Sequence, residues 1–107
     1  MKKYKLSESG ARGWFIGNFP EAVVQTQDFE VCYQTNPPGN PMDDHYHQVI
    51  TELQLVIRGR MIINNEEFGP GDICILYPGE EYRSTYLEDT ETVAVKWPSI
   101  PTDKYKL

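Results

Sequence analysis

The chain has 107 residues, a length suited to one compact domain with a single modest core. Its 16 acidic residues outnumber its 10 lysines and arginines, so it carries a formal net charge of -6 and no basic stripe that would follow nucleic-acid phosphates or anionic membranes. No stretch approaches the roughly 20 apolar residues that a membrane-spanning helix needs, and the basic start lacks the apolar run of a signal peptide. We therefore expect a cytoplasmic protein with no nucleic-acid and no membrane partner.

Apolar and polar residues alternate in short runs along the first third of the chain, and helical periodicity is almost absent. Strands are predicted there over residues 13–16, 21–25 and 29–35. Residues 36–41 are Asn-Pro-Pro-Gly-Asn-Pro, and these residue types cannot continue a strand ladder. This part of the sequence therefore predicts short strands followed by an irregular loop.

The rest of the chain continues the same pattern, with turns at short intervals. Strands are predicted over residues 45–49, 52–58, 61–63, 66–68, 73–77, 82–88 and 92–97. Asn64-Asn65 predicts a hairpin turn because asparagine tolerates positive φ, and Pro98 and Pro101 end the last strand before a short polar tail. Many short strands at this spacing are typical of a sandwich or barrel, so we predict one all-β domain over residues 1–107.

Cys32 and Cys74 both lie within apolar alternating segments. A free thiol in such a segment behaves as a small hydrophobic side chain, and a reducing compartment disfavours a disulfide. We therefore predict two free cysteines with a packing role.

The chain contains two histidines, which stand two residues apart as His45-Tyr46-His47. On a strand, this spacing directs both imidazoles to the same face. Glu52 begins the next predicted strand and points to the same place if the intervening turn folds that strand back. Two imidazoles and a carboxylate form a ligand set that Fe, Mn, Ni or Zn accepts, often with open positions for water and substrate. The residues alone leave two interpretations open: a divalent transition metal held by His45, His47 and Glu52, or two surface histidines near a glutamate on a polar edge strand.

The spacing around this triad resembles that of the cupin superfamily. Five residues lie between Gly39 and His45, and four lie between His47 and Glu52. Six more lie between Glu52 and Gly59, so the segment matches the first cupin motif without a gap. The resemblance implies a single-domain cupin-type jelly-roll β-barrel with a metal inside it.

The second cupin motif resembles residues 71–86 only in part, because Tyr82 stands where the motif has its metal-binding histidine. The resemblance implies three alternative roles for Tyr82. It binds the metal as a phenolate, which suits Fe(III) or Cu(II) but requires a large fall from the ordinary tyrosine pKa of about 10. It stands beside the metal as the catalytic acid or hydrogen-bond donor, with three protein ligands remaining. Or the site holds no metal and is a polar pocket.

Strand parity places further side chains relative to the predicted ligands. Residues that share a strand and a face with Glu52 or Tyr82 are predicted to face inward: Gln54, Val56, Ser84 and Tyr86. Lys96 is predicted to face solvent, because lysine is almost never buried without a partner. Two interpretations are open for Tyr77, Tyr82 and Tyr86: an aromatic lining with hydroxyl tips, which suits a sugar or a small aromatic ligand, or side chains that only pack in their strands.

These features are compatible with several functions. The first is a metal-dependent enzyme, an isomerase of the sugar type or a dioxygenase, that acts on a small molecule in the barrel. The second is a non-catalytic module that binds a sugar or a small acid, which the small size of the chain favours. The third is a metal-free sugar-nucleotide epimerase or isomerase, which would need a free histidine as its base.

The same barrel leaves edge strands and apolar surface exposed. Such features are commonly covered by a second copy of the same chain. We therefore predict a symmetric homodimer formed through paired or swapped N-terminal strands.

Overall fold

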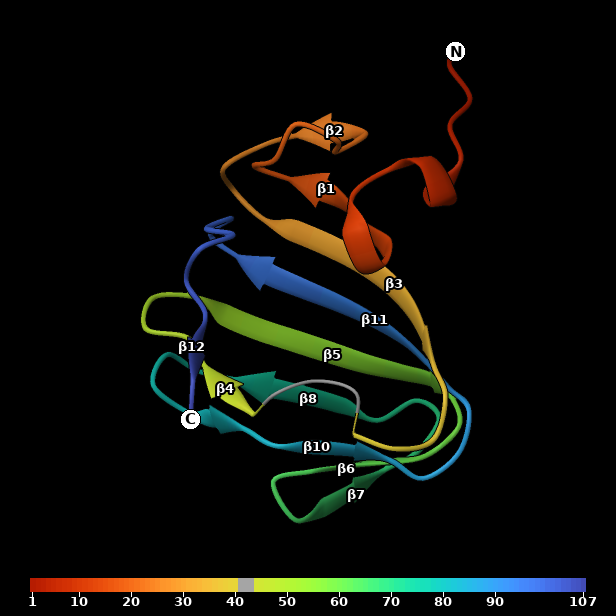
Figure 1. Cartoon of the computed structure of the whole chain (residues 1–107), viewed down its shortest axis with the longest axis vertical. Helices are drawn as coiled ribbons and strands as arrows, with labels where there is room; N and C mark the ends of the chain where they lie inside the picture. Colours follow the sequence, from red (N-terminus) through yellow and green to blue (C-terminus); the bar gives the residue numbers. More distant parts are fainter. Residues whose placement is uncertain (41–43) are drawn as a thin grey trace.

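The structure of the chain, a computed structural model, describes residues 1–40 and 44–107. Layers of β-strands form its framework (Figure 1). Within residues 1–40 and 44–107, the helical segments are two 3-10 turns of three residues each, η1 (Leu6–Glu8) and η2 (Ala11–Gly13). Among the described residues, no helix is long and apolar enough to cross a membrane. The prediction of an all-β fold is confirmed.

The first layer is a six-stranded sheet. Its strands follow the order β2 (Val24–Gln25), β1 (Trp14–Gly17), β3 (Glu30–Asn36), β11 (Thr90–Trp97), β5 (Thr51–Arg58) and β8 (Ile73–Leu76). β1 and β2 pair in parallel, and the other neighbours in this sheet are antiparallel. The long central strands β11 and β5 form the wall from which the site is built.

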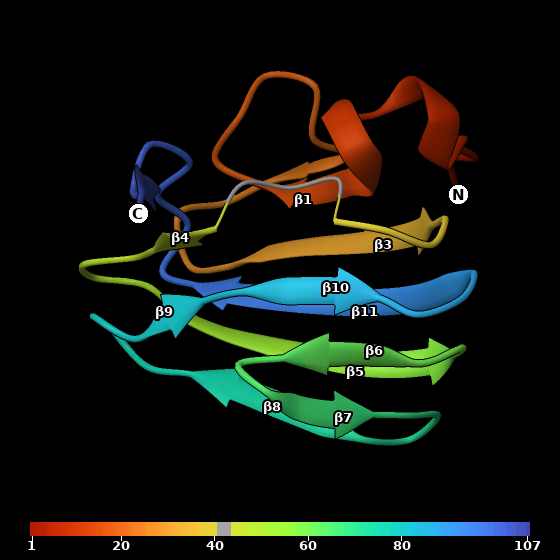
Figure 2. The same cartoon turned by 60° about the horizontal axis from the view of Figure 1, so that its bottom comes forward.

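The second layer contains two sheets of three strands each. One has the order β10 (Ser84–Tyr86), β6 (Met61–Ile63) and β7 (Glu66–Phe68). The other has the order β12 (Tyr105–Lys106), β4 (His45–Tyr46) and β9 (Glu81–Tyr82). In Figure 2, β10, β6 and β7 of this layer lie over β11, β5 and β8 of the first sheet.

The two layers meet in a hydrophobic core. Its buried side chains come from strands of both layers: Val56, Met61, Ile63, Leu76, Tyr82 and Tyr86. Val56 and Met61 have no exposed surface, and the burial of each contributes roughly 1.5–3 kcal/mol to the stability of the fold. This packing fixes the distance between β5 and the strands that face it.

The alternation of side chains along the strands confirms the parity predictions. Glu52, Gln54 and Val56 are buried on β5, while the residues between them are only partly buried. Ser84 and Tyr86 are buried on β10 in the same way. Polar and charged groups therefore enter the barrel on these strands because they share a face with core residues.

Two turns depend on backbone conformations with positive φ. Asn64 (φ 50°) and Asn65 (φ 67°) connect β6 to β7, which confirms the predicted hairpin. Gly59 (φ +91°) connects β5 to β6, and a Cβ there would lie 2.3 Å from the carbonyl oxygen of Asp89. Only glycine fits this approach of two backbones.

Several strand boundaries differ from those predicted. The strand predicted over 45–49 ends at Tyr46, because residues 48–50 donate their backbone N–H groups to Asp103 instead of to a neighbouring strand. The strand predicted over 82–88 divides at Arg83, since β9 pairs with β4 whereas β10 pairs with β6. Of the loop predicted over 36–41, residue 41 lies outside the described residues.

The polar tail also differs from its prediction. It contains the short strand β12, in which Tyr105 pairs with Tyr46 and Lys106 pairs with His45. The rings of Tyr46 and Tyr105 stack with centroids 5.4 Å apart. A strand of two residues has no periodicity to recognise in the sequence, because its pairing depends on a distant partner.

Candidate metal centre

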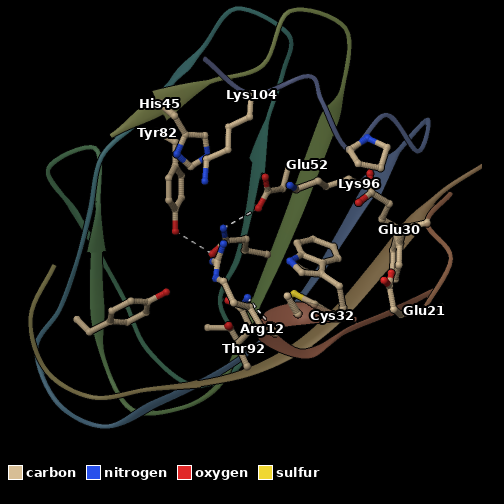
Figure 3. A pocket seen from close by; sticks show the side chains of 18 residues that line it. Arg12, Glu21, Glu30, Cys32, His45, Glu52, Tyr82, Thr92, Lys96 and Lys104 are labelled. Atoms are coloured by element: carbon tan, nitrogen blue, oxygen red, sulfur yellow. Dashed lines mark hydrogen bonds between the residues drawn. The ribbon is translucent and has the colours of Figure 1, made fainter. Parts of the chain in front are cut away.

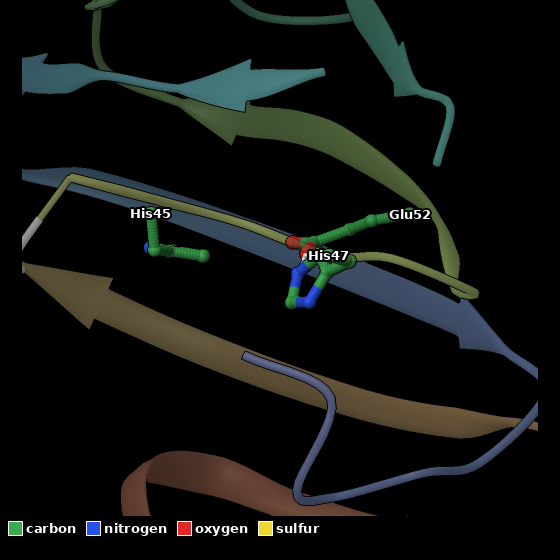
Figure 4. Close-up of side chains that lie close together, drawn as sticks. All are labelled: His45, His47 and Glu52. Carbon is green, nitrogen blue, oxygen red and sulfur yellow. Dashed lines mark hydrogen bonds and ion pairs between the residues drawn. The ribbon is translucent and has the colours of Figure 1, made fainter. Parts of the chain in front are cut away.

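His45, His47 and Glu52 lie together near the start of β5 (Figure 4). Each offers one possible ligand atom, and these atoms all lie within 4.8 Å of one another. The three side chains are buried, with 4% to 5% of each residue exposed. The structure therefore brings together the three residues from which the sequence predicted a metal site.

The turn between His47 and Glu52 is held by a residue from the other end of the chain. The carboxylate of Asp103 accepts hydrogen bonds from the backbone N–H groups of Gln48, Val49 and Ile50, at 3.0, 2.9 and 2.9 Å. Burial raises the pKa of Asp103, but these three donors outweigh it and hold the pKa below its ordinary value. A charged Asp103 thus fixes the turn that returns Glu52 to the histidines.

The ring of His47 lies between two oxygen atoms. Its Nδ1 faces the backbone carbonyl of Asp103, and its Nε2 lies 3.1 Å from Oε1 of Glu52. A carbonyl only accepts, so Nδ1–H donates to Asp103 and Nε2 is the nitrogen turned to the carboxylate. A proton or a cation is needed between Nε2 and Glu52 to satisfy both atoms. The geometry matches the common arrangement in which a backbone carbonyl orients a metal-binding imidazole.

Glu52 is held in the charged form that binds metals. Its burial raises the pKa, but the hydrogen bond from His47, the charge of Lys96 and the amide of Gln54 together lower it below the ordinary value. Nε2 of Gln54 donates to Oε2 of Glu52 at 2.8 Å. The donor set and the charge of this side chain fit a divalent cation.

Tyr82 lies beside the triad with its hydroxyl directed elsewhere (Figure 3). Its ring centroid is 5.1 Å from that of His45, and its hydroxyl donates to Oε1 of Gln54 at 3.3 Å. Burial raises the pKa of the phenol well above its ordinary value. Tyr82 is therefore neutral in this geometry and is connected to Glu52 through Gln54.

His45 and Glu52 of the triad line a cavity of about 310 Å³ between the two layers (Figure 3). His45, Glu52, Gln54 and Tyr82 line the end where the candidate ligands lie. Trp14 lines it farther along, from the first strand of the sheet. The volume is at the lower end of the range for small-molecule sites, roughly 300–1,000 Å³, so the cavity suits a small ligand.

Two side chains occupy places other than those predicted. Lys96 lines the cavity instead of facing solvent, because it stands in register with Glu30 on one side and Glu52 on the other. These carboxylates are the partners that a partly buried lysine needs. Tyr77 is 58% exposed at the end of β8, so only Tyr82 and Tyr86 of the predicted aromatic lining face the interior.

The two cysteines are free, as predicted. Cys32 lines the cavity, and burial raises the pKa of its thiol to about 12. Burial likewise raises the pKa of Cys74 to about 11. Neither thiol is a thiolate at neutral pH, so both act as packing groups.

Sequence reasoning missed the contributions of Asp103 and Glu30. Asp103 is followed by a polar tail, and its partners lie 53 to 56 positions earlier in the chain. Glu30 is only 5% exposed and lines the cavity, with Oε2 buried and without a hydrogen-bond partner among the described residues. A periodic strand pattern does not distinguish an inward glutamate from an outward one until the face of the strand is known.

No protein-family model matches the sequence, and no curated protein matches it. Solved structures do match. An uncharacterized conserved protein with a double-stranded β-helix domain from Klebsiella pneumoniae is 21% identical with a TM-score of 0.64, over 92% of this chain and 85% of that chain. A sugar phosphate isomerase of the cupin superfamily from Silicibacter pomeroyi is 19% identical with a TM-score of 0.56, over 65% of this chain and 50% of that chain.

Oxalate decarboxylase from Bacillus subtilis is a third similar structure. It is 19% identical with a TM-score of 0.64, over 76% of this chain but 24% of that longer chain. That enzyme contains Mn(II) centres. Together with the two-layer sheet arrangement, these similarities show that the chain has the double-stranded β-helix fold of the cupins, as the spacing around His45 implied.

Proposed function

We propose that this protein is a metal-binding cupin that acts as an enzyme on a small molecule held in the barrel. The observation that carries the proposal is the convergence of His45, His47 and Glu52, of which His45 and Glu52 line a cavity. Two imidazoles and a carboxylate suit Mn, Fe, Ni, Zn or Cu, and similar structures include an enzyme with Mn(II) centres.

The chain's own residues would prepare this site in distinct ways. His45, His47 and Glu52 would hold the cation, and the Asp103 carbonyl would keep Nε2 of His47 directed toward it. A bound metal would supply Lewis-acid chemistry, suited to the polarisation of a carbonyl in isomerisation or to the activation of O2 in oxygenation. Tyr82, neutral and hydrogen-bonded to Gln54, would donate a hydrogen bond or a proton to the ligand. Direct ligation by Tyr82 is the less favoured role, because its hydroxyl donates to Oε1 of Gln54.

Metal content tests the proposal. Tag-free protein is loaded with Mn(II) or Zn(II), passed through a desalting column and analysed by mass spectrometry of the metal. We expect one equivalent in the wild type and a large loss in Glu52→Gln, which removes the ligand charge but keeps the side-chain shape. Glu67→Gln is the matched control, since Glu67 is exposed on β7. A wild type without metal, or equal loading of Glu52→Gln and wild type, would overturn the proposal.

A non-catalytic module that binds a sugar or a small acid is the second candidate. It is favoured by the absence of a further histidine in the chain, since both imidazoles belong to the metal cluster. The raised pKa of Tyr82 also makes this phenol a weak acid at neutral pH. Binding of a ligand by the metal-loaded protein without any conversion of it, followed by NMR of the ligand over hours, would favour the module over the enzyme.

A further inference from the structure

Cations line the cavity of this acidic protein. The chain has 10 lysines and arginines against 16 acidic residues, and three of the ten reach this one space. They are Arg12, Lys96 and Lys104 (Figure 3), from η2, from β11 and from the segment before β12. Arg58, Arg60 and Arg83 lie outside this cavity and form ion pairs with Asp or Glu side chains. The cavity is therefore more basic than the molecule as a whole.

The backbone that presents Arg12 is strained. Arg12 has φ 56° and ψ 33°, a left-handed conformation that costs free energy for a residue with a Cβ. The next residue, Gly13, has φ +82°, and a Cβ there would lie 2.0 Å from the carbonyl oxygen of Tyr33. The carbonyl of Arg12 accepts a hydrogen bond from Nε2 of Gln34 at 2.8 Å. These contacts hold the turn in place and keep the arginine at the cavity.

Lys96 is also held in a defined place. Its backbone stands in register with Glu30 of β3 and Glu52 of β5, and its ammonium lies 4.5 Å from the ring centroid of Trp14. The face of an aromatic ring attracts a cation, so this contact holds the ammonium group in place. The charge of Lys96 therefore acts on the same space as the candidate ligands.

The balance of charge in the cavity changes when a divalent cation is present. The acidic side chains that line it are Glu21, Glu30 and Glu52, equal in number to the three cations. A bound divalent metal then leaves the cavity with an excess of positive charge. In a protein of net charge -6, such an interior selects anions over neutral molecules of the same shape.

We propose that the ligand of this cavity is a small organic acid with two anionic groups, carboxylate or phosphate, one facing the metal and the other paired with Arg12. The inference rests on the proposed function, because the metal provides one of the two sites of attraction. Arg12 suits the second group, since a guanidinium can form two parallel hydrogen bonds to a carboxylate or a phosphate. Lys96 and Lys104 add to the attraction without being required to touch the ligand.

Calorimetric titration of Mn(II)-loaded protein tests the inference with three probes. Succinate carries two carboxylates, phosphoglycolate carries a phosphate and a carboxylate, and succinamide is the neutral analogue of succinate. We expect at least one acid to bind, with succinamide about tenfold weaker or undetectable. The more tightly bound acid identifies the preferred anionic group.

Arg12→Gln is the decisive variant, and Arg58→Gln is its control because the Arg58 side chain is 79% exposed and pairs with Glu91. We expect Arg12→Gln to weaken the acid about tenfold with unchanged metal content, and Arg58→Gln to match the wild type. Equal affinity for acid and diamide, no acid binding up to roughly 10 mM, or an unaffected Arg12→Gln would overturn the inference. Loss of metal in the wild type would instead overturn the proposed function, and this inference with it.

Discussion

An oxygen atom lies next to each of the two ring nitrogens of His47. Its Nδ1 faces the carbonyl of Asp103, and its Nε2 lies 3.1 Å from Oε1 of Glu52. Asp103 reaches this ring from the last segment of the chain, whereas Glu52 follows His47 by five positions. The sequence predicted His47 as a ligand, but it did not predict that Asp103 orients the His47 ring.

The pH dependence of metal binding follows from the protonation of the ligands. The pKa of Glu52 is lowered in the folded protein, so this carboxylate stays charged well below neutrality. The imidazoles of His45 and His47 must be neutral to bind a metal, so protons compete with the metal for both side chains. We expect metal affinity, measured by competition with a chromophoric chelator, to fall as the pH is lowered from about 7.5 to about 5.5. An affinity that stays constant from pH 7.5 to pH 5.5 would contradict ligation by histidine.

Tyr82 offers an optical test of its role. Its hydroxyl donates to Gln54 and its pKa is raised by burial, so we expect no phenolate charge-transfer band after loading with Fe(III) or Cu(II) at neutral pH. Tyr82→Phe should then keep the metal stoichiometry of the wild type, as should the control Tyr86→Phe. A visible band that disappears in Tyr82→Phe and persists in Tyr86→Phe would show instead that Tyr82 is a ligand.

At the scale of elements, the site depends on a turn and on a short strand. The turn over residues 48–50 directs three N–H groups to Asp103, and the side chain of Ile50, 1% exposed, anchors it in the interior. β12 then pairs with β4, next to His45. The position of both histidines therefore depends on a C-terminal segment that contributes no ligand side chain.

Asp103→Ala should reduce both stability and metal affinity. It leaves three N–H groups without their acceptor, and we expect a loss of roughly 1–3 kcal/mol in the free energy of unfolding, measured with urea. Asp72→Ala is the matched control, because Oδ2 of Asp72 accepts only a local hydrogen bond from Gly69 at 2.8 Å. This control should lose stability but keep the wild-type metal affinity. Unchanged metal affinity in Asp103→Ala would refute the positioning role.

The stability difference between the wild type and Asp103→Ala should also depend on pH. Because the pKa of Asp103 is lower in the folded protein than its ordinary value, its stabilising contribution is complete above about pH 4 and is lost as the pH falls through the folded value. The difference in stability between wild type and Asp103→Ala should accordingly shrink below about pH 4.

At the scale of the whole molecule, apolar side chains are exposed at both edges of the six-stranded sheet. Ile73 and Ile75, on the edge strand β8, are 56% and 42% exposed, and Ile57 on the neighbouring β5 is 43% exposed. At the opposite edge, β2 exposes Val24. Each edge presents unpaired backbone groups and apolar surface, both of which a second copy could cover.

We predict a symmetric homodimer at micromolar concentration, measured by sedimentation velocity. The sequence favours contact through the N-terminal strands, so Val24→Lys on β2 should shift the protein toward the monomer. Ile75→Lys tests the other edge, on β8, with a change of the same kind. A wild type that sediments as a monomer would contradict the dimer, and dissociation by Ile75→Lys alone would move the contact to β8.

The sequence by itself determined the features that arise from local spacing. Alternation predicted the inward faces of β5 and β10, the Asn64-Asn65 turn predicted a hairpin, and the distance from His45 to Glu52 predicted the triad. Each of these depends on neighbours within a few positions, so a single chain segment contains the whole signal.

Only the tertiary structure decided which distant groups complete the site. Asp103 contacts His47, which lies 56 positions earlier in the chain. Lys96 lies between Glu30 and Glu52 because three separate strands pair in one register. Arg12 lines the cavity from a left-handed backbone conformation, which the neighbouring residues in the sequence did not predict. These contacts arise from the pairing of strands far apart in sequence, and the free energy that selects that pairing is spread over the whole core.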